Sequence, residues 1–195
     1  MSLWIKYDMR IVVYKNDSVP ENAYLVVANL LHDAFAERIG QGIYFSCASF
    51  TPEDVKSVLT ECGYLFLAYD HDNIPMGTVM LLVSKKRQFI YGRHENLAVS
   101  SNFKRKGVGA ALFNKLYDFA DKLNLDFLTS VTAVNASSSV NWHKKRGFLI
   151  YSKNYGEKYD SYSFVLPIRK LRILYIRPVR WAIYHLLSFY HRIRK

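Results

Sequence analysis

Hydrophobic positions in the first third of the chain recur at helical spacing after one short strand-like run. Residues 10–14 are mostly β-branched or aromatic, which is typical of a strand. Apolar residues then recur every three or four positions between Pro20 and Gly40, and again between Thr51 and Gly63. A proline at the start and a glycine after the last turn mark both segments as helices. The chain is therefore predicted to open with a strand followed by two helices.

The central part of the chain contains apolar runs without helical spacing, which are expected to form buried strands. The turn-like segment 71–75 between the first two runs predicts an antiparallel hairpin. Helical spacing returns at residues 112–123, and a short helix is expected to end just before Gly147. Strands are predicted at residues 64–69, 77–83, 89–99, 126–134, 148–152 and 161–166.

The end of the chain differs from the rest in charge. Residues 167–195 contain eight cations and no acid, and removing these eight from the net charge of +11 leaves +3 for the remainder. Pro178 is expected to open a basic amphipathic helix in this tail. Three binding partners of this helix remain possible. These are a membrane surface, the domain itself or the second subunit of a homodimer, and nucleic acid as the least favoured. One face of the helix would carry Val179, Ile183, Leu186, Tyr190 and Ile193, and the other Arg180, Tyr184, Ser188, His191 and Lys195.

Composition indicates one globular domain. With 195 residues, 50% of them hydrophobic and 22% charged, the chain has the size for a single buried core. We expect residues 1–8 to be an N-terminal extension or leader, 9–166 the domain and 167–195 the tail. No apolar run has the length of a membrane-spanning helix and the start lacks the apolar core of a signal peptide, so a cytoplasmic location is expected. Cys47 and Cys62 lack metal-site spacing and are expected to be buried, reduced thiols.

A basic, glycine-containing segment stands between the predicted strand 89–99 and the following helix. It reads Lys104-Arg105-Lys106-Gly107-Val108-Gly109. Glycines let the backbone approach a phosphate, whereas cations at the positive end of a helix are unfavourable unless an anion is bound there. The Lys-Ser/Thr of a P-loop is missing, and Leu112 occupies the third-glycine position of a dinucleotide fingerprint. The segment therefore predicts a pyrophosphate site of another class.

These residues resemble the GNAT family, the GCN5-related N-acetyltransferases, whose loop reads Arg/Gln-x-x-Gly-x-Gly/Ala after a strand. Lys104 replaces the usual Arg or Gln, and the family's second signature resembles the segment from Asn135 to Gly147-Phe148. The order of elements agrees from Arg10 to Leu166. The resemblance implies a mixed α/β (α+β) fold with a central, mostly antiparallel sheet of six to seven strands. That sheet would be splayed in the middle and flanked by about four helices, with the basic C-terminal helix in addition.

The resemblance also implies the reaction. An acetyl group would pass from acetyl-CoA to the primary amine of a small molecule, by direct attack of the amine within a ternary complex. Lys144 or Lys145 joins Lys104 and Lys106 as a candidate partner of the CoA 3′-phosphate. The alternative is a non-catalytic module that keeps the fold and binds a CoA-like ligand, membrane or nucleic acid. The residues expected to hold acetyl-CoA are Leu97, Val99, Lys104, Arg105, Lys106, Gly107, Val108, Gly109, Ala110 and Asn135.

Two residues are expected to act in catalysis. Strand alternation places Glu95 on the same face as Leu97 and Val99, which favours it as the general base. The alternative is a surface glutamate paired with Arg93. His143 stands where the family usually has the tyrosine that protonates the thiolate, although a partly buried structural histidine is the other interpretation. Expected walls of the acceptor site are Tyr44, Phe45 and Tyr155.

Overall fold

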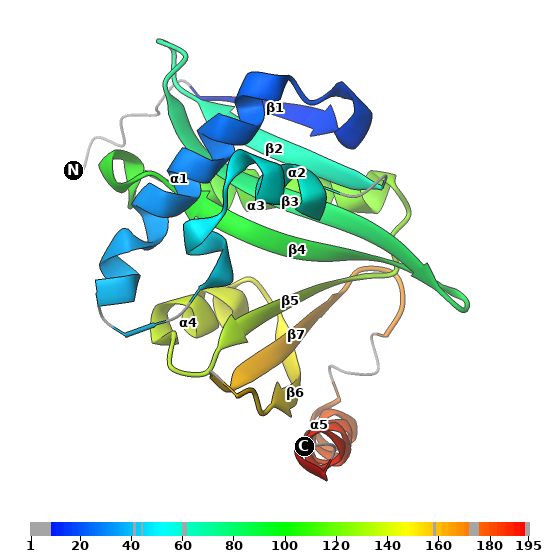
Figure 1. The fold of residues 1–195 in the computed structure, drawn as a ribbon. Coiled ribbons are helices and arrows are strands. Elements are labelled where there is room, and N and C mark those ends of the chain that lie inside the picture. The colour runs from blue at the N-terminus through cyan, green and yellow to red at the C-terminus, as the bar shows by residue number, and fades with distance from the viewer. Residues whose placement is uncertain are drawn as a thin grey trace, which may run out of the picture. The chain divides into compact units, whose positions relative to one another are not determined.

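The protein is described by a computed structural model over residues 9–40, 42–43, 45–59, 62–157, 159–171 and 176–193. Within these residues the strands hydrogen-bond in the order β1-β2-β3-β4-β5-β7-β6 (Figure 1). The strands are β1 (Arg10–Lys15), β2 (Gly63–Tyr69), β3 (Pro75–Lys86), β4 (Phe89–Val99), β5 (Phe127–Ala133), β6 (Leu149–Asn154) and β7 (Ser161–Pro167). The helices are α1 (Glu21–Gly40), α2 (Pro52–Val58), α3 (Val108–Lys122), α4 (Ser137–Lys145) and α5 (Arg177–Ile193).

The predicted order of elements is confirmed, and the predicted strand at 89–99 coincides with β4. The hairpin strand β3 is longer than expected and runs to Lys86. Arg87 then turns the chain with a left-handed φ of 55°. Cys47 is buried as expected, but Cys62 is exposed, so the expectation of two buried thiols is wrong for Cys62. Among the described helices, none has the length and apolarity needed to cross a membrane.

The chain folds as two compact units. The first comprises Met1–Gly40, Phe45–Leu82 and Asn96–Phe119, and the second Gln41–Tyr44, Val83–Glu95 and Ala120–Lys195. The first unit therefore holds β1, β2, most of β3, the end of β4, helices α1 and α2 and most of α3. The second unit holds the start of β4, the strands β5 to β7 and helices α4 and α5.

Helices cover both faces of the strands in the first unit. Leu65 and Leu67 of β2 lie in one core cluster with residues of α1 and α2, such as Leu31 and Val55. The alternate residues Tyr64 and Phe66 contact Phe119 of α3 instead, with ring centroids 4.9 and 5.6 Å apart. Because successive side chains of a strand point to opposite faces, both faces need apolar residues. This double cover explains why β2 is an uninterrupted apolar run in the sequence.

Gly77 of β3 lies close to both β4 and α3. A Cβ atom at this position would stand 2.6 Å from the Ala98 carbonyl oxygen, 3.2 Å from Leu112 Cδ1 and 3.3 Å from Val108 Cγ1. Gly77 therefore permits the packing that holds the start of α3 on the sheet.

Replacing Gly77 by alanine is expected to destabilise the protein by about 2–3 kcal/mol, because the added methyl group meets backbone that cannot move aside. This loss corresponds to a fall in Tm of roughly 5–10 °C in thermal unfolding. Gly40→Ala is the matched control, since a Cβ there meets no atom within 4 Å. An unchanged Tm in Gly77→Ala would contradict the close approach.

In the second unit, β4 and β5 are parallel neighbours, pairing Tyr91 with Phe127 and Arg93 with Thr129. β5 and β7 pair antiparallel along their whole length. Asp126, just before β5, ties several segments together. Its carbonyl oxygen accepts hydrogen bonds from the backbone N–H groups of residues 168–170, and its carboxylate accepts the N–H of Ile90 at 2.9 Å. Burial alone raises the pKa of Asp126, but the Ile90 N–H and the ammonium of Lys170 outweigh it and lower that pKa below its usual value.

Helix α5 docks on β6 through the side that was predicted to be polar. Ser188 is buried, and its Oγ accepts the backbone N–H of Lys153 in β6 at 2.9 Å. Tyr184, one turn earlier, is half-buried, whereas Leu186 and Ile193 are exposed. Both predicted faces contain half-buried residues, Ile183 on one and Tyr184 on the other, and Ser188 makes the hydrogen bond to the domain. The reason is that β6 is an edge strand, whose outward N–H groups need acceptors.

Candidate active site

The basic loop 100–107 is fixed at its start by two hydrogen bonds to distant elements. The N–H of Ser100 donates to the carbonyl of Met76 in β3 at 2.9 Å, and the N–H of Ser101 donates to the Asp33 carboxylate in α1 at 2.7 Å. Burial raises the pKa of Asp33, but hydrogen bonds from Ser101 and Ser100 and the charge of Lys104 together lower it below its usual value. Asp33 is therefore an ionised anchor for the loop.

The loop turns into α3 through left-handed backbone. Arg105 has φ 63° and Gly107 has φ 84°. The N–H of Ala111 donates to the Gly107 carbonyl at 3.0 Å as part of the first helical turn. The N–H groups of residues 108–110 precede it, in the turn of a helix that has no internal acceptors for them. Alternating left-handed residues followed by a helix start form a concave set of N–H groups suited to an anion.

The two glycines of the loop leave room for a ligand. A Cβ at Gly107 would meet no atom within 4 Å, and one at Gly109 would meet Val99 Cγ2 at 3.4 Å. Lys104, Arg105 and Lys106 are exposed beside this space. Lys106 Nζ lies 5.1 Å from the centre of the Phe103 ring. A pyrophosphate group fits such a site, because the backbone donors and the cations surround open space.

The end of β4 contains a break in strand geometry. Asn96 has a left-handed φ of 54°, and its side-chain amide lies 3.7 Å from Met80 Sδ. Asparagine tolerates this conformation better than most residues do. Side chains do not alternate regularly between the two faces across such a residue. Alternation therefore does not place Glu95 on the same face as Leu97 and Val99. Leu97 and Val99 themselves are half-buried.

Glu95 forms an ion pair with its neighbour on the same strand. Its Oε1 lies 3.1 Å from Arg93 Nε, and the Glu95 side chain is 31% exposed. The carboxylate is thus reachable from solvent, as a base requires, and it also has the pairing that the alternative interpretation expected. The geometry is compatible with both roles.

His143 of α4 is buried and hydrogen-bonded through both ring nitrogens. Only 5% of the residue is exposed. Nδ1 lies 2.8 Å from the Ser139 carbonyl oxygen, which can only accept, so Nδ1 carries the proton. Nε2 lies 2.8 Å from Ser130 Oγ and accepts its hydroxyl proton in the neutral ring. Burial lowers the pKa of His143, which the Ser139 hydrogen bond opposes only in part. This is the geometry of a neutral histidine that fixes α4 to β5.

A second buried histidine joins the same hydrogen-bonded group. His94 Nδ1 lies 3.5 Å from Ser130 Oγ, and its ring stacks on Trp142 with centroids 5.6 Å apart. Burial, helped by the neighbouring His143, lowers the pKa of His94 to about 3. His94, Ser130 and His143 therefore form a neutral polar group inside the second unit.

The two buried histidines predict a loss of stability in mild acid. In the unfolded chain a histidine has a pKa near 6.5. Below that pH the unfolded state therefore binds protons, whereas the buried histidines of the folded state stay neutral. Stability is then complete above pH 6.5 and falls as the pH drops towards the folded pKa of about 3. For His94 alone the loss at pH 5 is about 2 kcal/mol. Urea unfolding at pH 7.5 and pH 5 measures this loss.

Two variants test whether His94 causes this pH dependence of stability. His94→Phe keeps an aromatic ring beside Trp142 and is expected to be less sensitive to pH over the same interval. His71→Gln changes an exposed histidine and is expected to behave as the unmodified protein does. If His94→Phe loses as much stability between pH 7.5 and pH 5 as the unmodified protein, His94 is not the source.

Of the remaining predicted site residues, Phe45 belongs to the first unit, and Asn135 and Tyr155 belong to the second. Asn135 is exposed in the turn between β5 and α4. Phe45 stacks on Phe35 with ring centroids 4.7 Å apart and packs against the core of the first unit, so much of it serves packing. Tyr155, in the second unit, has Lys153 Nζ 4.6 Å from its ring centre. Tyr44 lies outside the described residues.

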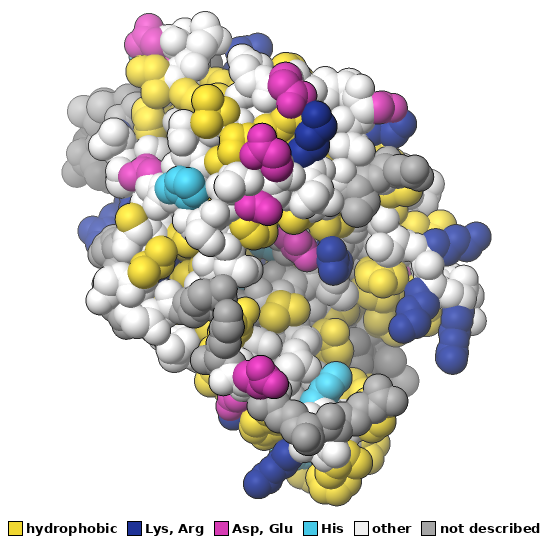
Figure 2. Space-filling view, in the orientation of Figure 1, with side chains coloured by type: hydrophobic (Ala, Val, Ile, Leu, Met, Phe, Trp, Pro, Cys, Tyr) yellow, Lys and Arg dark blue, Asp and Glu magenta, His cyan; other side chains and the backbone are white. Residues whose placement is uncertain are grey.

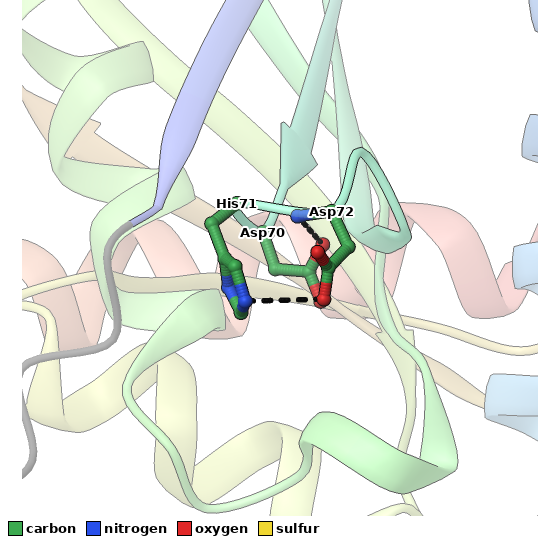
Figure 3. A group of neighbouring side chains, drawn as sticks. All are labelled: Asp70, His71 and Asp72. Carbon is green, nitrogen blue, oxygen red and sulfur yellow. Dashed lines mark hydrogen bonds and ion pairs between the residues drawn. The ribbon is translucent and has the colours of Figure 1, made fainter.

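One cluster of the described residues has the composition of a metal site. Asp70, His71 and Asp72 offer ligand atoms within 4.8 Å of one another (Figure 3). Asp70 Oδ1, however, accepts the N–H groups of Asp72 and Ile74 at 3.0 and 2.8 Å, which closes the turn between β2 and β3. His71 Nε2 lies 3.1 Å from Asp72 Oδ2. The hydrogen bonds of Asp70 give it a role in the turn that needs no metal.

Three residues that matter at the site were not identified from the sequence. Asp33 is 68 positions from the Ser101 N–H that it accepts, and Ser130 is 13 positions from His143. Gly77 lies in the middle of an apolar strand. A glycine inside a strand is the one available signal, since it often marks a close approach of backbone. Nothing in the spacing of Asp33 or Ser130 points to their partners.

Among solved structures with the same fold, the ribosomal-protein-S18-alanine N-acetyltransferase from Escherichia coli has 15% identity and a TM-score of 0.66 over 83% of this chain and 96% of its own. A structure of the NatC complex bound to Gag peptide and CoA has 19% identity and a TM-score of 0.63 over 83% and 99%. The spermidine/spermine N-acetyltransferase from Vibrio cholerae has 13% and 0.61 over 88% and 96%.

At these identities the likeness establishes the fold, and it confirms the mixed α/β GNAT fold expected from the sequence. Among curated protein sequences, none matches the chain significantly. The sequence model described as "Acetyltransferase (GNAT) family" matches residues 27–148, which contain the basic loop, Glu95 and His143. Because this match covers more than half of the chain, the protein belongs to the GNAT family of acetyltransferases.

Proposed function

We propose that the protein transfers an acetyl group from acetyl-CoA to the primary amine of a small molecule. The observation that carries this proposal is the loop 104–110, where left-handed residues at 105 and 107 lead into the free N–H groups of α3. Such an array of donors with three cations beside it suits the pyrophosphate of CoA. The family match and the CoA-bound NatC structure with this fold support the same donor.

The backbone of residues 105–110 would hold the pyrophosphate, and Lys104 or Lys106 the 3′-phosphate, with Lys144 and Lys145 as further candidates. The exposed position of Lys104 and Lys106 supports their part in this assignment. Leu97 and Val99 would offer backbone groups to the pantetheine arm and the acetyl group. An N–H near Val99 would stabilise the negative charge on the carbonyl oxygen during attack, which is a large contribution in acyl transfer.

The reaction joins two substrates directly. The lone pair of the amine nitrogen attacks the carbonyl carbon of the thioester, the carbon–sulfur bond breaks, and an amide and the CoA thiol are formed. One proton leaves the nitrogen and one is taken up by the sulfur, so the step needs no oxidant or other reactant. The amine must be neutral to attack, and we assign its deprotonation to Glu95, directly or through water.

His143 receives a positioning role in this proposal. Its single proton is on Nδ1 and is held by the Ser139 carbonyl, so the neutral ring has none to give to the thiolate. Its contacts with Ser130 and Ser139 instead support the turn that carries Asn135, the expected pantetheine contact. The thiolate is left to take its proton from water or from the reacting amine.

The acceptor is best defined by a panel of amines assayed with acetyl-CoA by release of free thiol and by mass spectrometry. Structures with this fold include a spermidine/spermine N-acetyltransferase and a ribosomal-protein-S18-alanine N-acetyltransferase, so the panel should contain polyamines and short peptides besides small monoamines. Acetylation of a small amine is the expected result. Binding of acetyl-CoA without turnover of any amine would favour the non-catalytic module instead.

A further inference from the structure

Helix α5 presents an apolar stripe to solvent on the side opposite its docking face. Leu186, Phe189 and Ile193 are each between 63% and 70% exposed. With 3.6 residues per turn, Leu186, Phe189 and Ile193 share one side of the helix and are turned away from β6, whereas Trp181 is two turns from Ser188 and lies on the same side as Ser188. Figure 2 shows hydrophobic side chains gathered at the surface over α5. Contiguous exposed apolar residues mark an interaction surface, unlike apolar residues scattered singly.

The same helix is exclusively basic. Arg177, Arg180 and Arg192 lie on it, and the sequence contains no Asp or Glu after Asp160. Asp160, which follows the edge strand β6, is paired with Lys153 at 2.9 Å. No acidic residue of the segment after Asp160 therefore balances the positive charge of α5. This charge is complementary to an anionic surface.

A hollow of about 400 Å³ adjoins the start of the helix. It is lined by Ile150, Arg177, Pro178, Arg180, Trp181 and Tyr184. Because Ile150 belongs to β6, this hollow lies on the docking side of the helix and not beside the apolar stripe.

We propose that α5 binds the surface of membranes containing anionic lipids. The helix, roughly 25 Å long, lies parallel to the surface with Leu186, Phe189 and Ile193 inserted among the acyl chains. Arg180 and Arg192, on the two flanks of this stripe, interact with lipid phosphates.

The two other occupants fit the surface less well. A second copy of the chain would bring identical basic helices together in a twofold interface, so that like charges would meet. Nucleic acid would satisfy the arginines, but its phosphates and base edges offer nothing to the aliphatic side chains of Leu186 and Ile193. An anionic membrane offers phosphates to the arginines and acyl chains to the apolar stripe.

The test is co-sedimentation of the full-length protein with vesicles of phosphatidylcholine alone or with about 30% phosphatidylglycerol, without acetyl-CoA. Binding to the anionic vesicles and a loss of binding at about 0.5 M NaCl are expected. Leu186→Glu combined with Phe189→Glu should lower the partition coefficient at least about tenfold.

The matched control is Leu25→Glu, which changes a residue 54% exposed on α1 and is expected to bind vesicles normally. Circular dichroism and Tm establish that all variants are folded. The proposal is overturned if the double variant binds as well as the unmodified protein. It is also overturned if sedimentation velocity shows dimers that the double variant abolishes while vesicles are not bound, or if a DNA duplex binds and vesicles do not.

Discussion

Replacing Gly109 by valine is expected to abolish detectable binding of acetyl-CoA, with an increase in Kd of at least about 100-fold, equivalent to roughly 3 kcal/mol. The substituent would stand in the first turn of α3, where the N–H groups of residues 108–110 need direct access to the pyrophosphate. A Cβ at this position makes an ordinary contact with Val99 Cγ2 at 3.4 Å, so the fold has room for a side chain. Isothermal titration calorimetry measures the affinity.

Gly109→Ala is the graded control, and it should bind within a few-fold of the unmodified protein, because the family's loop tolerates alanine there. Gly107 is a poorer position for the test, since its φ of 84° would strain any other residue irrespective of the ligand. Normal acetyl-CoA affinity in a folded Gly109→Val protein would remove the loop from the cofactor site.

Glu95→Gln is expected to lower kcat by about 10²-fold while leaving acetyl-CoA affinity unchanged. Glutamine keeps the size and a hydrogen-bonding oxygen but cannot take a proton from the amine. Glu95 lies on β4, outside the segment 105–110 assigned to the pyrophosphate, which is why binding should be preserved. Steady-state kinetics with the best amine of the panel, together with calorimetry, separates the two quantities.

Arg93→Gln distinguishes a base from an ion-pair partner. It removes the 3.1 Å pair but leaves the Glu95 carboxylate in place. If Glu95 is the base, the Arg93 variant keeps most of its kcat. Equal losses in both variants would mean that the pair holds the strand and that the carboxylate has no separate chemical part.

The fold was predictable because its strands and helices have strong and different periodicities. β2 and β3 are apolar on both faces since helices cover both, and α3 keeps a clear helical stripe because only one of its sides is buried. The loop 104–109 was recognisable because glycines and cations at the start of a helix are informative together.

The contacts that complete the candidate site were not predictable in the same way. The Asp33–Ser101 hydrogen bond joins residues 68 positions apart, and no local pattern encodes such a pair. The left-handed Asn96 interrupts the alternation on which the choice of Glu95 depended. The orientation of α5 was missed because hydrophobic patterning assumes that the apolar side seeks the core. Here the buried hydroxyl of Ser188 accepts a backbone N–H of β6, and hydrophobicity scales contain no term for such a hydrogen bond.

The bond between Ser188 and the backbone of Lys153 also bears on how readily the protein aggregates. Without α5, the outer edge of β6 would offer its N–H groups to any other extended chain, and unprotected strand edges are templates for intermolecular sheets. Truncated forms of the protein should therefore self-associate at high concentration for reasons unrelated to lipid. The helix that carries the basic surface is also the cover that keeps this sheet from growing.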